Sequence, residues 1–370
     1  MYSEDPSVKG SERMRRCDTL PIEHSSIEPG TPLPKKMETF WPSNINKLLL
    51  EKCIYCHLRG NSPETRQYPT VVSQVTKEDD NWQCVMAHKG EENVMAHLQS
   101  SFEEADFRIP LHVLDSLKAG HKVCVVISND TDVIVALLYH IPVFQQHNLE
   151  QLWVRAGVGD TTRYVPLHTL FQRVGHQLCA VLPAVHSLTG CDITSRIGSK
   201  KAALQVEPEK FLKHFGRSPT LSPSLIHNAE HYLVKVLKSG SDVTNFDDLR
   251  AEMFHFNKSS SLHNLPPTSQ GLLPHILRGF FNAYTTMHTL DSHTDPETVE
   301  SLKPEDCGYE YEQGQLIPAT LWKILPAHWS VFCTCDKCAR STCSCRMAGV
   351  RCCRFCRCKK TSPYCKNPIA

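Results

Sequence analysis

The chain has 370 residues, of which 41% are hydrophobic and 21% are charged. At about 150 residues per domain this length favours two or three folded units, and the composition excludes a short peptide scaffold and wholesale disorder. The sequence contains no run of about 18 apolar residues, and its opening residues are too charged for a secretory signal. We therefore expect a soluble intracellular protein without a membrane segment.

The net charge of +1 hides an uneven distribution. Ten of the 18 cysteines lie between Cys333 and Cys365, and residues 333–366 contain nine lysines or arginines but only one acid, which gives this segment a charge of +8. The rest of the chain therefore carries −7, the difference between +1 and +8. An acidic body with a basic, cysteine-rich tail indicates two functional modules, and the concentrated positive charge points to a polyanionic partner.

The first part of the chain alternates loops with short periodic segments. Residues 1–40 lack a sustained apolar period and are expected to be mostly loop, with one short helix at 12–16. Apolar spacing then predicts an amphipathic helix at 44–57, a strand at 68–75, and a helix at 92–119 that breaks near Pro110 and ends at Gly120.

The strongest strand signal is the continuous apolar run Val123–Ser128, which leads through a polar turn into the apolar helix 133–140. Such a run is typical of a parallel sheet covered on both faces, so we expect an α/β fold with helices on both sides of a partial parallel sheet. The remaining expected elements are strands at 151–156 and 162–165, and helices at 166–174, 177–188, 211–215, 226–237, 247–256 and 268–286.

Acidic residues cluster around the end of this strand. Asp130 and Asp132 follow it directly, Asp192 lies in LTGCDITSRIGSKKAAL, and FEEAD precedes the strand. Ligands bind at the carboxyl ends of strands in open α/β sheets, and carboxylates from several segments suit a pair of Mg²⁺ or Mn²⁺ ions at a phosphodiester. The ordinary alternative is that Asp130 is a helix N-cap and that the FEEAD acids are a solvated helix face.

The segments SNDTDVIVAL and LTGCDITSRIGSKKAAL resemble the nuclease core of the PIN-like superfamily, in its flap-endonuclease and XPG branch. In that branch, helix acids precede an acidic doublet at a strand end, and a Gly-x-Asp element precedes a hairpin that binds the nucleic-acid backbone. The resemblance covers roughly residues 95–205. By position it implies metal-binding catalytic residues at Glu104, Asp106, Asp130, Asp132 and Asp192.

The same resemblance implies contacts to nucleic acid. Gly198 matches the position where a backbone approaches phosphate, although an ordinary turn also explains a glycine there, and Lys200 and Lys201 match its cations. Lys9, Arg13 and Arg16 match phosphate-steering residues that follow the family's second strand. Two strands that carry acids in the family have no counterpart in the chain, so it resembles an N-terminally truncated or degenerate member with an incomplete two-metal site.

The tail, CTCDKCARSTCSCRMAGVRCCRFCRCKKTSPYCKN, contains three Cys-x-Cys pairs alternating with single cysteines. Neighbouring thiolates of this kind suit zinc rather than mutual disulfides, and a secreted disulfide knot is the weaker alternative. The tail resembles a tesmin-type CXC domain, which implies zinc and DNA contact. With Cys353 set aside, the predicted ligands are Cys333, Cys335, Cys338, Cys343, Cys345, Cys352, Cys356, Cys358 and Cys365.

Nine thiolates cannot form three separate four-thiolate sites, so either some sulfurs bridge two ions or fewer than three ions bind.

The remaining sequence signals are weaker evidence of function. The sequence C-x-x-C-H at Cys53–His57 matches a haem-attachment pattern, but it lies in an expected amphipathic helix, where zinc ligation by the two cysteines is the alternative. His88, His97 and His186 are interpreted as structural, and Cys191 as a packed small side chain rather than a nucleophile.

These observations leave two functional hypotheses. One is a nucleic-acid-binding protein, derived from a metal-dependent nuclease but weak or inactive, with a zinc-binding tail that contacts DNA; the other is an active Mg²⁺-dependent structure-specific endonuclease. DNA is the expected partner and RNA the second one, and the expected location is the nucleus, or the nucleus and cytoplasm together. The expected domains are a mostly loop region at 1–40, a PIN-like core at 41–205, a helical extension at 206–330 and the zinc module at 331–370.

Overall fold

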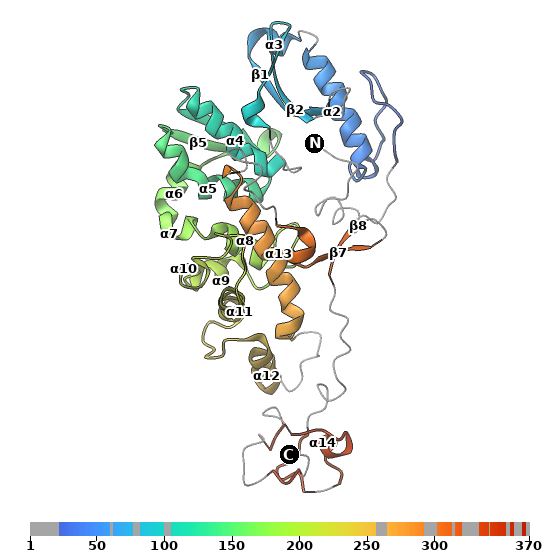
Figure 1. Cartoon of the computed structure of the whole chain (residues 1–370), viewed down its shortest axis with the longest axis vertical. Helices are drawn as coiled ribbons and strands as arrows, with labels where there is room; N and C mark the ends of the chain where they lie inside the picture. The colour runs from blue at the N-terminus through green and yellow to red at the C-terminus, as the bar shows by residue number, and fades with distance from the viewer. Residues whose placement is uncertain are drawn as a thin grey trace. The chain divides into compact units, whose positions relative to one another are not determined.

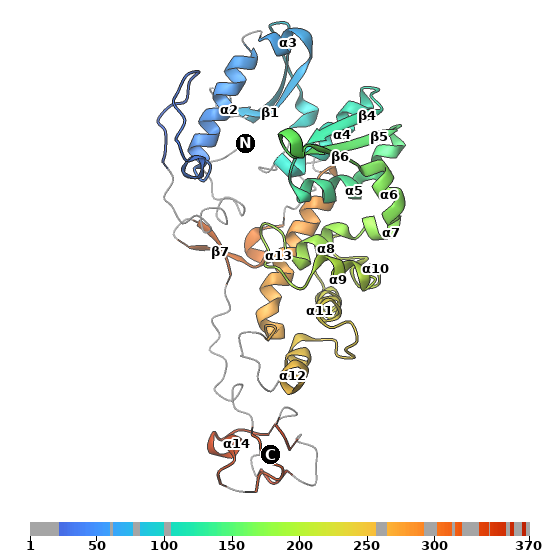
Figure 2. The same cartoon turned by 180° about the vertical axis from the view of Figure 1, so that it is seen from behind.

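A computed structural model (Figures 1 and 2) describes residues 22–59, 62–76, 82–99, 105–256, 265–291, 302–312, 315–319, 333–339, 341–352, 356–358 and 365–367. The chain divides into two compact units, one of residues 1–240 and 273–319 and the other of residues 241–272 and 320–370. No helix within the described residues is long and apolar enough to cross a membrane.

The first unit begins with a helix packed on a small antiparallel sheet (Figure 1). Its elements are α2 (Asn44–Arg59), α3 (Pro63–Gln67), β1 (Thr70–Thr76), β2 (Trp82–His88) and β3 (Glu91–Val94), and the sheet has the strand order β1-β2-β3. Tyr55 of α2 is buried against Val85 of β2, with Val72 of β1 beside them. The helix at 44–57 and the strand at 68–75 are thus confirmed within one or two residues.

The expected helix at 92–119 is wrong in its first part. Residues 91–94 form β3 because Lys89 and Gly90 both have positive φ angles, 53° and 84°, and so make a tight hairpin turn back onto β2. The helix, α4, spans Ala105–Lys118 and continues through Pro110, which lies in its second turn and does not break it. Gly120 follows the helix end at φ 94°, as expected.

The second sheet has the order β4-β5-β6, and its strands are β4 (Val123–Ile127), β5 (Gln151–Ala156) and β6 (Arg163–Pro166). Helix α5 (Thr131–Gln146) connects β4 to β5, which pair in parallel. Strand β6 instead pairs antiparallel to β5, because the short connection between them allows a hairpin but no crossover. The expected mixed α/β fold is confirmed, although its sheet is parallel in only one of two pairings.

Only one face of this sheet carries the core. Cys124, Leu152 and Val154 are buried against Leu114 of α4 and Leu137 of α5 in one apolar cluster. On the other face, the alternate residues of β4 stay exposed within the described residues: Val123, Val125 and Ile127 are 52%, 54% and 70% exposed. The expectation of helices on both faces therefore does not hold for β4.

The rest of the first unit is mostly helical (Figure 2). Its helices are α6 (Leu167–Val174), α7 (His176–Cys179), α8 (Leu182–Thr189), α9 (Lys200–Gln205), α10 (Glu209–Leu212), α11 (Pro223–Leu237) and α13 (Ser269–Met287), of which α13 belongs to this unit from Leu273 onward. A short hairpin follows, made of β7 (Tyr309–Glu312) and β8 (Gln315–Pro318). In the second unit the described helices are α12 (Phe246–Phe256) and α14 (Ser344–Met347).

Helix α13 fixes the position of α8. His275 Nε2 lies 2.8 Å from the carbonyl oxygen of Leu188, and Asn282 Nδ2 donates to Ser187 Oγ at 2.9 Å. Gly279 permits the close approach, since a Cβ at that position would lie 3.0 Å from a Leu188 methyl group. These contacts place the carboxyl end of α8, and the loop after it, beside the amino end of α5.

Candidate functional site

The cysteine-rich tail forms a cluster of buried thiols. Seven cysteines are at most 6% exposed, and two more are partly buried. Among the described residues of the tail, Val350 is the one partly buried hydrophobic residue other than cysteine that packs with them. The fully or mostly buried members are Cys333, Cys338, Cys343, Cys345, Cys352, Cys356 and Cys358; Cys335 and Cys365 pack against them. So small an apolar content cannot hold the segment together by packing alone.

The sulfur atoms lie at distances that suit a shared metal ion. The Sγ atom of Cys333 is 3.4 Å from that of Cys338 and 3.8 Å from that of Cys352, and the Cys338 and Cys352 sulfurs are 3.6 Å apart. These separations are far longer than a disulfide bond of about 2.05 Å. Four sulfurs held tetrahedrally about 2.3 Å from one zinc ion are separated by a little under 4 Å, so the cluster matches zinc-thiolate geometry.

Three groups of four cysteines have sulfurs within 4.8 Å of one another: Cys333, Cys335, Cys338 and Cys343; Cys333, Cys345, Cys352 and Cys356; and Cys333, Cys338, Cys352 and Cys358. The groups need twelve ligand positions but contain only eight different cysteines, and Cys333 belongs to all three. They cannot be filled independently, so sulfurs must bridge ions or fewer ions must bind. The tail can thus hold a metal such as zinc.

The backbone of the tail is arranged around these sulfurs. Cys343 is the N-cap of α14. Burial raises the pKa of its thiol, but hydrogen bonds from the backbone N–H groups of Arg346 and Cys345 have the larger combined effect and lower that pKa to about 7. Burial raises the pKa of Cys345 to about 11 and that of Cys338 to about 12. Most of these crowded thiols therefore stay protonated at neutral pH until a cation replaces the protons.

The predicted acids at the end of β4 take ordinary structural roles as well. Asp130 is the N-cap of α5, and its Oδ1 atom accepts a hydrogen bond from the backbone N–H of Asp132 at 2.9 Å. Oδ1 of Asp132 lies 2.6 Å from Nε2 of His186, which is on α8. Both side chains are mostly buried, with 13% of Asp132 and 12% of His186 exposed. Sequence reasoning did not predict this contact, because the two residues are 54 positions apart.

Lys200 extends this contact into a chain of three side chains. Its Nζ atom lies 3.3 Å from Nδ1 of His186 and also donates to the carbonyl oxygens of His186 and Gly190, at 3.0 and 2.6 Å. An ammonium group only donates, so Nδ1 accepts and the imidazole proton is assigned to Nε2, which donates to Asp132. Lys200 thereby caps the last carbonyls of α8, where a cation is favoured. Burial lowers its pKa.

Gly198 has a packing role in this loop. Its φ is 66°, and a Cβ at that position would lie 2.6 Å from Cγ1 of Val236 on α11. Only glycine fits such a contact without movement. Lys201, the next predicted cation, is exposed. Both predicted lysines are exposed, but the Lys200 ammonium is engaged by the end of α8.

The remaining predicted residues are only partly described. Asp106 lies in the first turn of α4 and Asp192 in an exposed turn between Cys191 and Ile193, while Glu104, Lys9, Arg13 and Arg16 fall outside the described residues. Among the residues that the structure describes, the metal-binding groups of three or more side chains contain cysteines of the tail and none of these acids. Cys53 and Cys56 of α2 belong to none of them either.

Cys191 lies beside the lysine network. Its Sγ atom is 3.2 Å from Oγ1 of Thr194, and burial raises the pKa of its thiol. A thiol with a raised pKa is a poor nucleophile at neutral pH. The geometry is therefore that of a packed side chain, which agrees with the sequence-based interpretation.

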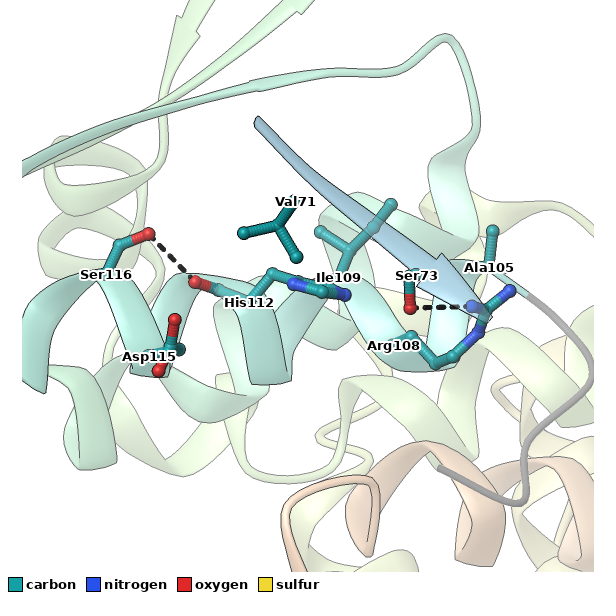
Figure 3. A pocket seen from close by; sticks show the side chains of 8 residues that line it. All are labelled: Val71, Ser73, Ala105, Arg108, Ile109, His112, Asp115 and Ser116. Carbon is teal, nitrogen blue, oxygen red and sulfur yellow. Dashed lines mark hydrogen bonds between the residues drawn. The ribbon is translucent and has the colours of Figure 1, made fainter. Parts of the chain in front are cut away.

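A separate pocket of about 540 Å³ opens between β1 and α4. Figure 3 shows Val71 and Ile109 near its middle, Arg108 with Ser73 at one end, and Asp115 at the other. Arg108 is 4% exposed and donates from Nη1 to Oγ of Ser73 at 2.8 Å. None of the predicted catalytic residues except Asp106 shares an element with this pocket, so it is not the predicted acidic site.

Comparison with family models, with curated proteins and with solved structures finds no match to the chain. The geometry of the tail is compatible with a CXC-like module.

Proposed function

We propose that this chain is a nucleic-acid-binding protein in which a zinc-ordered tail supplies most of the affinity for DNA. The single observation that carries the proposal is the cluster of buried thiols, because it can hold a metal ion around which we expect the strongly basic segment to fold. The tail's charge of +8, against −7 for the rest of the chain, supports a polyanion as its ligand. DNA is the partner that the CXC resemblance implies, and with a DNA partner we propose the nucleus as the location.

Several described cations of the tail are accessible to a ligand. Lys337, Arg351 and Lys366 are exposed. Arg357 is also exposed but pairs with Asp336 at 2.8 Å, and the partly buried Arg346 donates to the carbonyl oxygen of Ala339 at 2.7 Å. Phosphates are recognised chiefly by accessible lysines and arginines, and each phosphate that a protein neutralises makes binding more salt-dependent, by about 0.9 in the log–log slope on duplex DNA. Lys337 and Arg351 are therefore the first cations to test.

The experiment is a fluorescence-anisotropy titration of labelled duplex DNA with the whole chain. Reversing both charges, Lys337→Glu with Arg351→Glu, is expected to weaken binding at least about tenfold and to flatten the salt slope by about 2. The matched control is Lys118→Glu with Lys303→Glu, which reverses two exposed body cations. Equal losses from tail and body variants would refute the tail as the main binding surface.

We further propose that the body descends from a metal-dependent nuclease and is weak or inactive as given. The engagement of Asp132 with His186 supports this, because a divalent ion at Asp132 would have to compete with the imidazole proton. The alternative is an active endonuclease that uses Mg²⁺ or Mn²⁺ at Asp130, Asp132 and Asp192. Incubation with flap, nicked and single-stranded DNA in either metal distinguishes them, since turnover that Asp130→Ala and Asp192→Ala both abolish would establish the enzyme.

A further inference from the structure

Strand β4 presents an unusual edge. Among the residues that the structure describes, it is the terminal strand of the order β4-β5-β6, and Val123, Val125 and Ile127 are all more than half exposed. Exposed edge strands normally carry lysine, proline or a bulge that prevents pairing with other chains. The sequence VCVVI of β4 contains no such residue, and its register with β5 is regular. An apolar, unprotected edge of this kind marks an interaction surface.

The main-chain groups of the same three residues face the free edge. The carbonyl oxygen of Lys122 accepts from Gln151, and the N–H of Ser128 donates to Arg155, so the even-numbered residues point their polar groups toward β5. Along a strand these groups alternate in direction. The N–H and C=O groups of Val123, Val125 and Ile127 therefore point away from β5, ready to pair with a further strand.

We propose that this edge binds a second copy of the chain, with two β4 strands pairing antiparallel about a two-fold axis at Val125. In this register Val125 faces Val125 of the second copy, and Val123 faces Ile127. Every facing pair is apolar and β-branched, which favours cross-strand packing, and the three outward-facing residues of each strand allow about six main-chain hydrogen bonds. The two sheets then form one continuous six-stranded sheet.

The charges at the strand ends favour the antiparallel arrangement. Lys122 precedes β4 and pairs with Glu150 of its own chain at 2.8 Å in an exposed contact, and Asp130, the N-cap of α5, lies shortly after the strand. Antiparallel pairing brings the amino end of one strand to the carboxyl end of the other, so Lys122 approaches the acidic end of the second copy. Parallel pairing would instead place Lys122 beside its own counterpart, a like-charge contact that disfavours it. The same surface patch serves both copies, so the assembly closes as a dimer.

The test is the mass of the whole chain in solution, measured by light scattering or sedimentation over a range of concentrations. The wild type is expected to change from 41.8 kDa to twice that mass as concentration rises. Val125→Lys places two lysines opposite each other and is expected to weaken dimerisation at least about tenfold, and Val125→Glu likewise. A mixture of these two variants is expected to recover dimers, because the axis then joins opposite charges. Val158→Lys, at a 77% exposed position outside the strands, is the matched control.

Each outcome decides the proposal. A wild type that stays monomeric at all concentrations would overturn it, as would larger open-ended assemblies. If the lysine and glutamate variants fail to recover dimers on mixing while their circular dichroism stays native, the two-fold register is wrong. Hydrogen exchange of the wild type gives a check without mutation: the amides of Val123, Val125 and Ile127 must gain protection with concentration, whereas protection in the monomer would show that the chain covers its own edge.

Discussion

Asp132 and His186 form a short contact, 2.6 Å between Oδ1 and Nε2, that joins the start of α5 to α8. Both side chains are mostly buried, so the pair is shielded from water on most sides. Lys200 binds the far side of the imidazole and the end of α8. The acid that the nuclease resemblance marks as a metal ligand is thus part of a structural network.

Replacing His186 by alanine is expected to lower the free energy of unfolding by about 1–3 kcal/mol, because a mostly buried carboxylate loses its hydrogen-bond donor. The measurement is urea denaturation followed by circular dichroism. His97→Ala is the control, since His97 pairs with Asp115 at a similar 2.7 Å but is 59% exposed, and exposed pairs contribute under about 1 kcal/mol. Equal losses from the two variants would contradict the structural role of the buried pair.

Lys200 and Lys201 are expected to behave differently when mutated. Lys200→Met removes the cation that caps α8 and should lower stability by about 1 kcal/mol, because the residue is exposed, with DNA affinity unchanged in the folded protein. Lys201→Met leaves an exposed surface and should leave stability within about 0.5 kcal/mol of the wild type. Thermal melting and anisotropy on the same samples check both, and loss of DNA binding without loss of stability in Lys200→Met would restore the phosphate-contact interpretation.

Burial lowers the pKa of His140 to about 4, since its ring is 3% exposed and lies between α5 and α13, where it contacts the Thr286 carbonyl and the Thr289 hydroxyl. The unfolded chain binds this proton at its ordinary pKa of about 6.5, so stability is full above that pH and declines as pH falls toward 4. The expected loss is about 3 kcal/mol. Denaturation at several pH values should show that the free energy of unfolding falls less with acid in His140→Gln than in the wild type. If its dependence on pH is unchanged, other groups cause the acid sensitivity.

Zinc affinity of the tail is expected to fall as pH falls. Raised thiol pKa values, such as about 11 for Cys345, mean that zinc must displace protons, and each proton released changes the affinity about tenfold per pH unit. Competition with a chelator at about pH 6 and pH 8 measures this. Cys333→Ser, which affects all three groups, should lose more zinc than Cys335→Ser, which affects one, and Cys179→Ser in the body should lose none. Equal zinc contents in all three variants would refute the shared role of Cys333.

Local sequence patterns predicted much of the secondary structure, whereas features that depend on contacts between distant residues were not predictable. The strand and helix at 123–146 follow from a continuous apolar run and an N-cap, both of which act over a few residues. Strand β3 was predicted as helix because its apolar positions also fit a helical period, and its pairing with β2 decided the matter.

The candidate sites divide in the same way. The thiol cluster could be predicted because its ligands lie within one short segment and cysteines have few alternative uses there. The contact of Asp132 with His186 could not, since a distance of 54 residues leaves no periodic signal. The close packing of Gly198 on Val236 could not be predicted either, because Val236 lies on the separate helix α11. The contact of Gly198 with phosphate stays a prediction.

The most direct test of the central claim is the DNA affinity of the whole chain before and after zinc is removed from the tail. The account predicts that chelation weakens duplex binding at least about tenfold and flattens the salt slope, and that adding zinc back restores both, because the tail cations are arranged only in the metal-bound fold. Cys333→Ser should bind as weakly as the stripped wild type. Affinity and salt slope that stay the same through chelation would contradict the account.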